Sequence, residues 1–407
     1  MSKWVKVSLR DISQSIQYGY TESAVYEPVG PKFLRITDIV PYFINWDSVP
    51  YCNINDDDYK KYKLQVDDIV IARTGATTGY NAIITQDIEA VFASYLIKFR
   101  INGEIANSKF IGHLLKSKGY FGYINCAIGG AAQPGINAKV LSAFSFMLPQ
   151  LPTQNRIVNV LSAYDDLIEN NNRRIVLLEK AAQELYKEWF VRFRFPEHES
   201  ARFENSIPEG WAVSRLGESV IITSSKRIYM SEYVDIGIPF YRSKEVIQSA
   251  NGEALTEPLY ISAEKFNELK DRFGAPCEND ILITSVGTIG VSFLVDNRVF
   301  YFKDGNLTWI QSSSKPEFAI YIYQWLNSAT GKSTLLMSTI GTSQSALTIE
   351  NLKKIKIILP KKEILKAYYN KSIDIISQKR LLQTKNQNLI RQRDMLLPRL
   401  MSGKLEV

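Results

Sequence analysis

The most regular hydrophobic pattern in the chain predicts a long helix between Ile157 and Trp189. Apolar side chains recur there at alternating intervals of four and three residues, and one place in the series is polar. This 3.5-residue repeat is typical of a coiled-coil helix rather than of a general amphipathic helix. The side chains that we expect to face a partner helix include Ile157, Leu161, Ile168, Asn171, Ile175, Leu178 and Leu185.

A second long helix is predicted near the end of the chain, where apolar residues recur at intervals of seven. We expect its partner-facing residues to include Ile375, Gln378, Leu382, Leu389 and Leu396. A shift of 207 residues places Gln378 at the position of Asn171, so each helix has an amide in its pattern. Two interpretations are open: the amides form a buried pair that fixes the register, or they lie at a solvated edge.

The same shift shows that the two halves of the chain repeat each other. It pairs Trp4 with Trp211, and with a few residues of slippage it pairs the apolar run after Asp68 with the run after Asp280. The matched landmarks keep their order over about 200 residues, which indicates an internal repeat. Short apolar runs bounded by Gly, Asn and Asp predict strands, and other stretches predict short helices.

The expected fold is therefore α+β: two similar mixed α/β domains, each followed by a long helix. We expect the two helices to pair as an antiparallel coiled coil, with an internal pseudo-twofold. The predicted boundaries are residues 1–149 for the first domain, 150–195 for the central helix, 196–210 for a linker, 211–360 for the second domain and 361–407 for the last helix and tail.

Composition limits the function. The chain has 407 residues, 45% of them apolar, and a formal charge of +7. Residues 360–407 contain eleven basic and four acidic residues, which equals the whole surplus. Neither domain is notably basic, so we expect weak DNA binding by the chain alone. No apolar run approaches a membrane span, no secretory signal opens the sequence, and three scattered cysteines argue against a disulfide framework. We expect a cytoplasmic protein.

The search for catalytic motifs gives no site. There is no GxGxxG after a strand, no HExxH, no GxSxG and no pair of carboxylates at metal-binding spacing. We expect no catalytic residues and no metal site in this chain.

Two pairs of Gly- and Thr-rich loops are the candidate binding elements, because they recur at corresponding places in both halves. Arginine and glutamine suit bidentate contacts with guanine and adenine, and hydroxyls suit phosphates. Ordinary hairpins are the alternative for any single loop. Arg35 and Arg242, which follow matched aromatic residues, are candidate phosphate contacts or plain strand-end arginines. The full set of candidate DNA-binding residues is Arg35, Arg73, Thr74, Thr77, Gln133, Arg242, Ser285, Thr288 and Gln344.

The chain resembles the specificity subunits of type I restriction-modification enzymes over essentially its full length. The resemblance rests on the layout, on the segment Leu185-Tyr186-Lys187-Glu188-Trp189-Phe190-Val191-Arg192-Phe193 and on the tail Leu397-Pro398-Arg399-Leu400-Met401-Ser402-Gly403-Lys404-Leu405. One departure is Pro152-Thr153-Gln154 at the start of the central helix, a looser form of the family's usual start. The resemblance implies two target-recognition domains, each recognising one half of a split, asymmetric sequence in double-stranded DNA.

The resemblance also implies partners. The helices would act as a spacer and would dock two methyltransferase subunits, and restriction subunits would join the complex. S-adenosylmethionine, ATP and Mg would then bind to those partner subunits, and none to this chain. Two other functions remain open: a self-contained DNA methyltransferase or nuclease, and a coiled-coil scaffold that does not bind DNA.

Overall fold

The structure is a computed structural model that describes residues 4–40, 44–129, 135–341 and 345–405. Its contacts divide the chain into two compact units. Unit 1 contains residues 1–170 and 389–407, and unit 2 contains residues 171–388. Two long helices, α6 (Leu151–Tyr186) and α13 (Lys362–Met401), contribute to both units.

The globular part of unit 1 is built around a four-stranded antiparallel sheet in the order β2-β7-β4-β5. Strands β3 and β6 form a separate two-stranded parallel sheet, and β1 pairs antiparallel with β8. The strands are β1 (Val5–Ser8), β2 (Ser13–Tyr18), β3 (Lys32–Leu34), β4 (Ile69–Ala72), β5 (Asn81–Ile83), β6 (Ala90–Phe92), β7 (Leu96–Ile101) and β8 (Ser145–Leu148). The helices are α1 (Ile36–Ile39), α2 (Asp56–Tyr62), α3 (Ser108–Leu114), α4 (Lys118–Ile128) and α5 (Ala138–Ser142).

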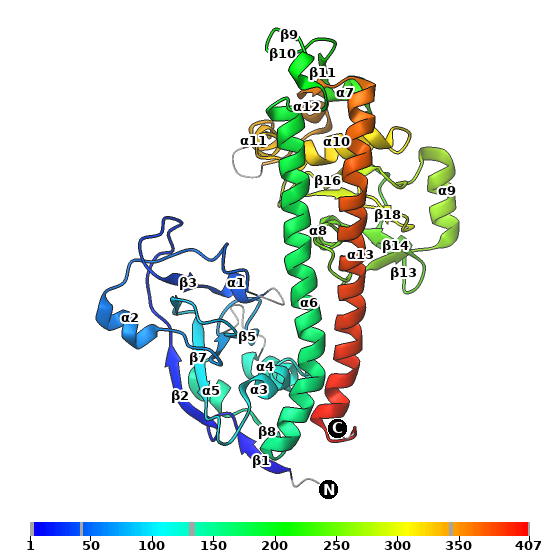
Figure 1. The fold of residues 1–407 in the computed structure, drawn as a ribbon. Helices are drawn as coiled ribbons and strands as arrows, with labels where there is room; N and C mark the ends of the chain where they lie inside the picture. Colours follow the sequence, from blue (N-terminus) through cyan, green and yellow to red (C-terminus); the bar gives the residue numbers. More distant parts are fainter. Residues whose placement is uncertain (1–3, 41–43, 130–134, 342–344, 406–407) are drawn as a thin grey trace. The chain divides into compact units, whose positions relative to one another are not determined.

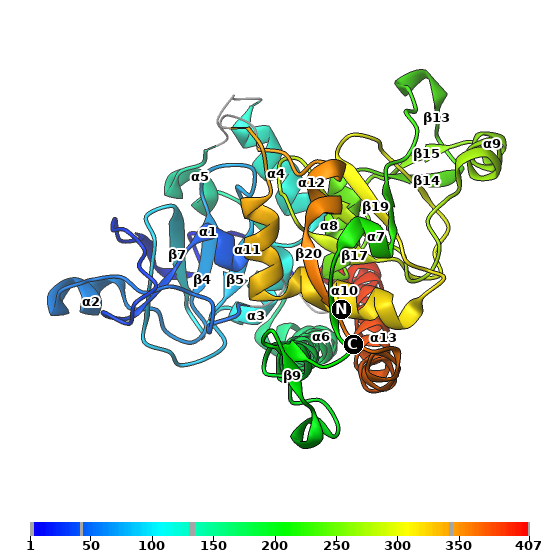
Figure 2. The same ribbon diagram turned by 90° about the horizontal axis from the view of Figure 1, so that it is seen from above.

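The globular part of unit 2 repeats this topology. Its four-stranded sheet has the corresponding order β12-β19-β16-β17, β14 pairs in parallel with β18, and β11 pairs antiparallel with β20. Two further strands, β13 and β15, extend the β14 sheet, beside helix α9 (Ala263–Phe273) (Figure 2). The strands are β11 (Ala212–Arg215), β12 (Ile221–Thr223), β13 (Tyr233–Val234), β14 (Ile238–Tyr241), β15 (Leu259–Ile261), β16 (Ile281–Thr284), β17 (Ser292–Leu294), β18 (Tyr301–Phe302), β19 (Leu307–Gln311) and β20 (Lys356–Leu359).

The helices of the second copy are α7 (Leu216–Ser219), α8 (Ser243–Asn251), α9 (Ala263–Phe273), α10 (Pro316–Asn327), α11 (Ala329–Met337) and α12 (Ile349–Lys354). Before β11 lie a 3₁₀ turn (His198–Ser200) and a small hairpin of β9 (Phe203–Glu204) and β10 (Ile207–Pro208). The shared strand order confirms the repeat and the α+β fold class.

The matched apolar runs form the central strands β4 and β16, whose residues are all buried. In β4, Ile69 and Ile71 join one hydrophobic cluster while Val70 and Ala72 join another. Because successive side chains of a strand point to opposite faces, burial of both faces requires an unbroken apolar run. This is why these segments show no alternation of polar and apolar residues.

A buried aspartate precedes each central strand and explains the matched acidic positions. Asp68 accepts two hydrogen bonds of 2.8 Å from Arg100. Asp280 accepts hydrogen bonds of 2.9 Å from the Trp309 indole and from the backbone N–H groups of Ser312 and Ser313. Buried carboxylates are tolerated only when they are paired or hydrogen-bonded in this way.

Helices α6 and α13 lie side by side and run antiparallel within each unit (Figure 1). In unit 2, Glu179 forms an ion pair of 2.6 Å with Lys379. In unit 1, Asp165 pairs with Arg393 at 2.7 Å. The residue numbers of each pair sum to 558, as they must in an antiparallel pair with constant register.

The buried residues of α6 follow the 3.5-residue pattern. Ile157, Leu161 and Ile168 are at most 3% exposed. Asn171, Ile175, Leu178 and Leu185 are half-buried, as are Ile375, Leu389 and Leu396 on α13, while Leu382 is buried.

Of the two interpretations of the amide positions, Gln378 fits the solvated edge, and a different amide of α13 is buried. Gln378 is exposed, whereas Asn386 is buried and its Oδ1 accepts a hydrogen bond of 2.8 Å from Asn171 Nδ2. Asn386 in turn donates to Asn172 Oδ1 at 2.8 Å. A shift of 207 residues identifies equivalent positions in the two copies. It does not identify residues that touch across an antiparallel helix pair, because the two residue numbers of such a contact have a constant sum, not a constant difference.

The end of α6 changes its winding, and the change buries two aromatic residues. A π-helical turn, Lys187–Val191, follows Tyr186 and places Trp189 and Phe190 in the core of unit 2. The Phe190 ring lies 4.7 Å from the rings of both Tyr321 and Tyr368. This aromatic cluster gives the segment Leu185–Phe193 its structural role.

Candidate nucleic-acid interface

The candidate binding loops lie next to each other in each copy. We call the loop after the central strand loop A (residues 73–80 and 285–290) and the loop before the last short helix loop B (residues 129–137 and 341–348). In the first copy, Thr74 forms an isolated β-bridge with Gly135. Val286 and Ala346 form the equivalent bridge in the second copy. In each copy, a β-bridge therefore joins loop A to the described end of loop B.

Arg73 is the only cation of loop A in the first copy, and it is held by an aromatic ring. Its guanidinium lies 5.0 Å from the centre of the Tyr18 ring, a cation–π distance. The Tyr18 hydroxyl accepts a hydrogen bond of 2.9 Å from Ala138 N–H, just beyond loop B. Tyr18 therefore contacts both loop A and the end of loop B. Nothing in the sequence marks this residue, since it ends an ordinary strand.

The exposed part of loop A in the first copy is small and polar. Gly75 has φ +79°, with open space around the position that a Cβ would occupy. Glycine is therefore required there by the backbone conformation, not by close packing. Thr74 and Thr77 are half-buried. Tyr95, whose carbonyl accepts a hydrogen bond from Arg73 N–H, is 59% exposed. This surface offers a guanidinium, hydroxyls and an aromatic face to a ligand.

Loop A of the second copy has the same backbone form but different side chains. Gly287 has φ +76°, matching Gly75. Thr288 is exposed. The predicted DNA contact Ser285 is buried, and its hydroxyl lies 2.7 Å from Thr308 Oγ1, so we base no DNA contact on it. Ser285 directly follows the central strand β16 and is buried like the residues of that strand.

Arg35 and Arg242 both have a structural partner. Arg35 forms a bidentate ion pair with Asp38, with two distances of 3.0 Å. Arg242 forms the equivalent pair with Glu245, at 3.1 and 2.5 Å. In both copies the arginine precedes a helix and the carboxylate lies in its first turn. We therefore base no DNA contact on these two arginines. The candidates Gln133 and Gln344 lie outside the described residues.

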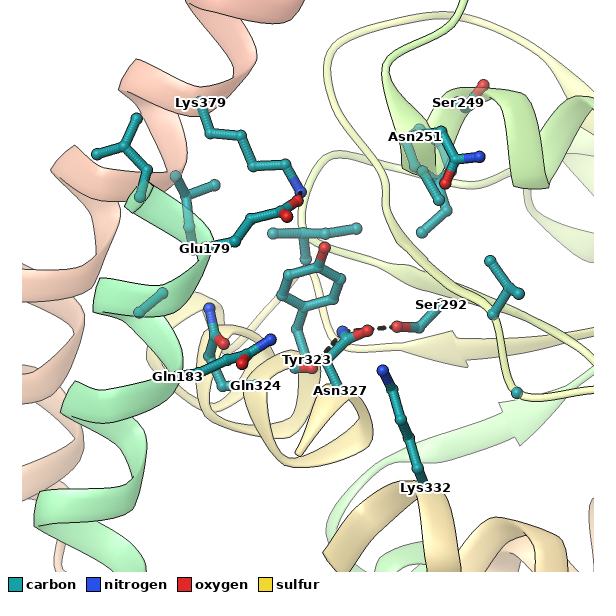
Figure 3. A pocket seen from close by; sticks show the side chains of 18 of the residues that line it. Glu179, Gln183, Ser249, Asn251, Ser292, Tyr323, Gln324, Asn327, Lys332 and Lys379 are labelled. Atoms are coloured by element: carbon teal, nitrogen blue, oxygen red, sulfur yellow. Dashed lines mark hydrogen bonds and ion pairs between the residues drawn. The ribbon is translucent and has the colours of Figure 1, made fainter. Parts of the chain in front are cut away.

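Unit 2 also contains a cavity of about 450 Å³. Figure 3 shows that Lys379 and Glu179 point toward each other at its edge, and that Asn327 bonds to Ser292. Its lining includes no histidine or cysteine. Among the described residues, no group of three or more His, Cys, Asp or Glu side chains could hold a metal ion. In the same ranges, no helix has the length and apolar character needed to cross a membrane.

The fold and the paired loops define a class of protein: a duplicated recognition module in which two similar domains present different loops and are joined by long helices. Comparison with known proteins agrees. A model of the type I restriction modification DNA specificity domain matches residues 1–180 and again residues 208–385. The chain therefore belongs to this family, as a type I specificity subunit with two target-recognition domains. The matched model describes a DNA specificity domain, not a catalytic one, which confirms the expected non-catalytic role.

Several relatives carry the corresponding names. The type I restriction enzyme MjaIX specificity subunit of Methanocaldococcus jannaschii is 29% identical over 74% of this chain and 69% of its own length. The putative MjaX specificity subunit of the same organism is 25% identical over 99% of this chain and 94% of its own. In fold, the chain is similar to the type I restriction-modification S subunit from M. genitalium, with a TM-score of 0.55 and 15% identity over 98% of this chain and 96% of that one.

Proposed function

We propose that each target-recognition domain recognises one half of an asymmetric, bipartite DNA sequence through its joined loops A and B. The observation that supports this proposal most strongly is that the same pair of loops is joined by the same β-bridge in both copies, while the side chains differ. Identical loops would favour a symmetric site, whereas loops as different as these favour two unlike half-sites.

In the first domain, Arg73 is the candidate base reader. A guanidinium can donate two hydrogen bonds to the O6 and N7 atoms of guanine in the major groove. Its contact with Tyr18 limits its motion. Nε is buried and Nη1 donates to Ser94 O at 3.5 Å, so the proposal relies on the outer edge of the guanidinium for the DNA. Thr74 and Thr77 supply hydroxyls for phosphates or base edges. In the second domain Thr288 is the described residue best placed for this role, and Gln133 and Gln344 remain candidates for adenine.

The long helices would act as the spacer between half-sites. α6 has 36 residues, so it is about 54 Å long at 1.5 Å per residue. One turn of DNA is about 34 Å. A helix of this length is sufficient to set the separation of two half-sites that lie about one turn apart.

Exposed positions on the helices would receive the partner subunits. In unit 2, Leu177 on α6 is 64% exposed and Leu381 on α13 is 53% exposed, and Lys371, Gln378 and Lys385 on α13 are also exposed. This mixture of apolar and basic side chains suits docking of methyltransferase subunits. The S-adenosylmethionine, and the ATP and Mg needed for restriction, would bind to methyltransferase and restriction partners.

The test is to assemble the chain with its methyltransferase subunits and to methylate a library of duplexes. The proposal expects one asymmetric bipartite motif. Arg73→Ala should relax the sequence requirement in one half of that motif and leave the other half unchanged. Arg10→Ala, which removes an exposed arginine far along the chain from both loops, is the control. A motif unchanged by Arg73→Ala, or altered in both halves, would contradict the assignment.

A further inference from the structure

A cluster of basic and aromatic side chains lies at the end of helix α9 in the second target-recognition domain. Phe273 is the last residue of α9 and is 41% exposed. Lys226 Nζ lies 4.6 Å from the centre of its ring, and the Arg272 guanidinium lies 5.1 Å from it. Both distances are within the range of cation–π contacts. One exposed ring therefore holds two cations near each other.

This cluster is connected to loop A through two neighbouring segments. The segment that contains Lys226 follows β12, and Ser224 Oγ in it donates a hydrogen bond of 3.1 Å to Leu307 O. Arg227, one residue further, bonds to Asp304 at 3.1 Å. Asp304 and Leu307 belong to the second segment, and Asn306 lies between them. The carbonyl of Asn306 accepts a hydrogen bond of 2.9 Å from Ser285 N–H at the start of loop A. The cluster and loop A thus flank the same strand connection.

The first domain has a related feature at the same place in its topology. Tyr62 is the last residue of α2, the helix that corresponds to α9. Lys61 Nζ lies 5.0 Å from the centre of its ring, and the Tyr20 ring packs against it at 5.3 Å. A cation above an aromatic ring at the end of this helix therefore occurs in both copies.

A ring contact orders a cation without neutralising its charge. The ring attracts the cation through its quadrupole, and the outward N–H groups remain able to bind an anion. Arg272 also contacts Glu268 at 3.2 Å, but both side chains are about half or more exposed, and such surface pairs are weak. The anion must be attracted locally, because residues 201–359 contain sixteen basic and seventeen acidic residues and have no general positive charge.

We propose that Lys226, Arg272 and Phe273 form a phosphate-contact surface that binds the DNA backbone beside the bases recognised by loop A of the second domain. This inference depends on the proposed function and adds to it the residues that supply affinity rather than sequence. Backbone contacts position a protein on the duplex and carry no base information. Their loss should weaken binding to all sequences to a similar extent.

The test measures the salt dependence of duplex binding by the assembled complex. For each phosphate contact that is lost, the slope of log affinity against log salt concentration should decrease by about 0.9. Lys226→Ala combined with Arg272→Ala should therefore reduce the slope by about 1.8. Affinity should decrease by similar factors on cognate and non-cognate duplexes, and the methylated motif should stay the same. Lys226→Arg with Arg272→Lys should restore the slope.

Lys270→Ala is the matched control, since Lys270 is exposed on the same helix and is not one of the two cations over the Phe273 ring. A double variant that behaves like Lys270→Ala would overturn the inference. A changed methylation motif with an unchanged slope would also overturn it, because the cluster would then recognise bases. If the proposed function were wrong, the result would differ: the complex with the unaltered chain would show no preference among duplexes. The difference in salt slope between the unaltered chain and the double variant would still show whether the cluster contacts phosphates.

Discussion

Removal of the Asp165 carboxylate should destabilise unit 1, because it leaves a buried arginine with too few partners. The Arg393 side chain is 5% exposed and bonds to Asp165 at 2.7 Å. It also bonds to Asp394 at 2.8 and 3.0 Å. Partial burial opposes ionisation of Asp165, but Lys116, His113 and Arg393 nevertheless hold the pKa of this carboxyl below its ordinary value. Asp165 is therefore ionised in the folded protein.

The magnitude follows from this geometry. Breaking a buried ion pair by removing one partner costs about 3–5 kcal/mol. Asp165 is 34% exposed and Asp394 keeps its own contact, so we expect roughly 2–3 kcal/mol for Asp165→Ala. Arg393→Met leaves a carboxylate that water can reach, and we expect a loss of about 1 kcal/mol. The double variant removes both charges of this pair and should be about as stable as Arg393→Met alone.

The assay is hydrogen exchange of the purified chain, resolved to peptides from α3 and from the last turns of α13, because exchange reports local stability in a chain of several domains. Asp166→Ala removes a neighbouring exposed carboxylate and is the control. The reasoning would be refuted if Asp165→Ala behaved like Asp166→Ala, or if the two substitutions at Asp165 and Arg393 had additive effects.

Three further predictions concern stability. Burial lowers the pKa of His113 from 6.5 to about 4. As the pH falls, the unfolded chain therefore protonates this imidazole before the folded chain does. The free energy of unfolding of unit 1 should decrease by roughly 3 kcal/mol between about pH 6.5 and pH 4. His113→Gln should flatten that profile in unfolding measured across the pH range. Asn386→Ala should cost about 1–3 kcal/mol through two lost hydrogen bonds, whereas Gln378→Ala should leave urea unfolding unchanged. Asp280→Ala should lower the free energy of unfolding of unit 2 by about 3 kcal/mol or more, because it leaves Trp309 and backbone N–H groups unpaired, and thermal unfolding would show this.

The repeat was the feature of the fold that could be predicted best from the sequence. Central strands buried on both faces require unbroken apolar runs, and each run follows an aspartate, so the two copies could be matched despite low identity. The α6 pattern was also predictable, because most of its partner-facing residues are apolar.

The pattern on α13 could not be predicted as well, because several of its buried positions are polar. Ser372, Asn386 and Arg393 are at most 6% exposed, and in the sequence they look like surface residues. Their burial becomes intelligible only from the opposite helix, which supplies the partners of Asn386 and Arg393. No shift of the sequence against itself identifies such contacts.

The candidate site was predicted at the level of loops rather than side chains. Positive φ angles at Gly75 and Gly287 explain why the matched loops share glycines, and this signal is present in the sequence. Ser285 looked equivalent to the exposed hydroxyls, although its neighbour across the sheet, Thr308, holds it in the core. Tyr18 was missed because its role depends on Arg73, which lies far away along the chain. Phe273 was missed because Lys226, one of its two cations, is also distant in the sequence.

The central claim is that this chain determines which DNA sequence its complex methylates. Methylome sequencing of cells with and without the chain tests it most directly. The account predicts that removal of the chain abolishes methylation at one asymmetric bipartite motif and leaves all other methylated motifs in place. An unchanged set of methylated motifs, or loss of a palindromic motif only, would contradict it.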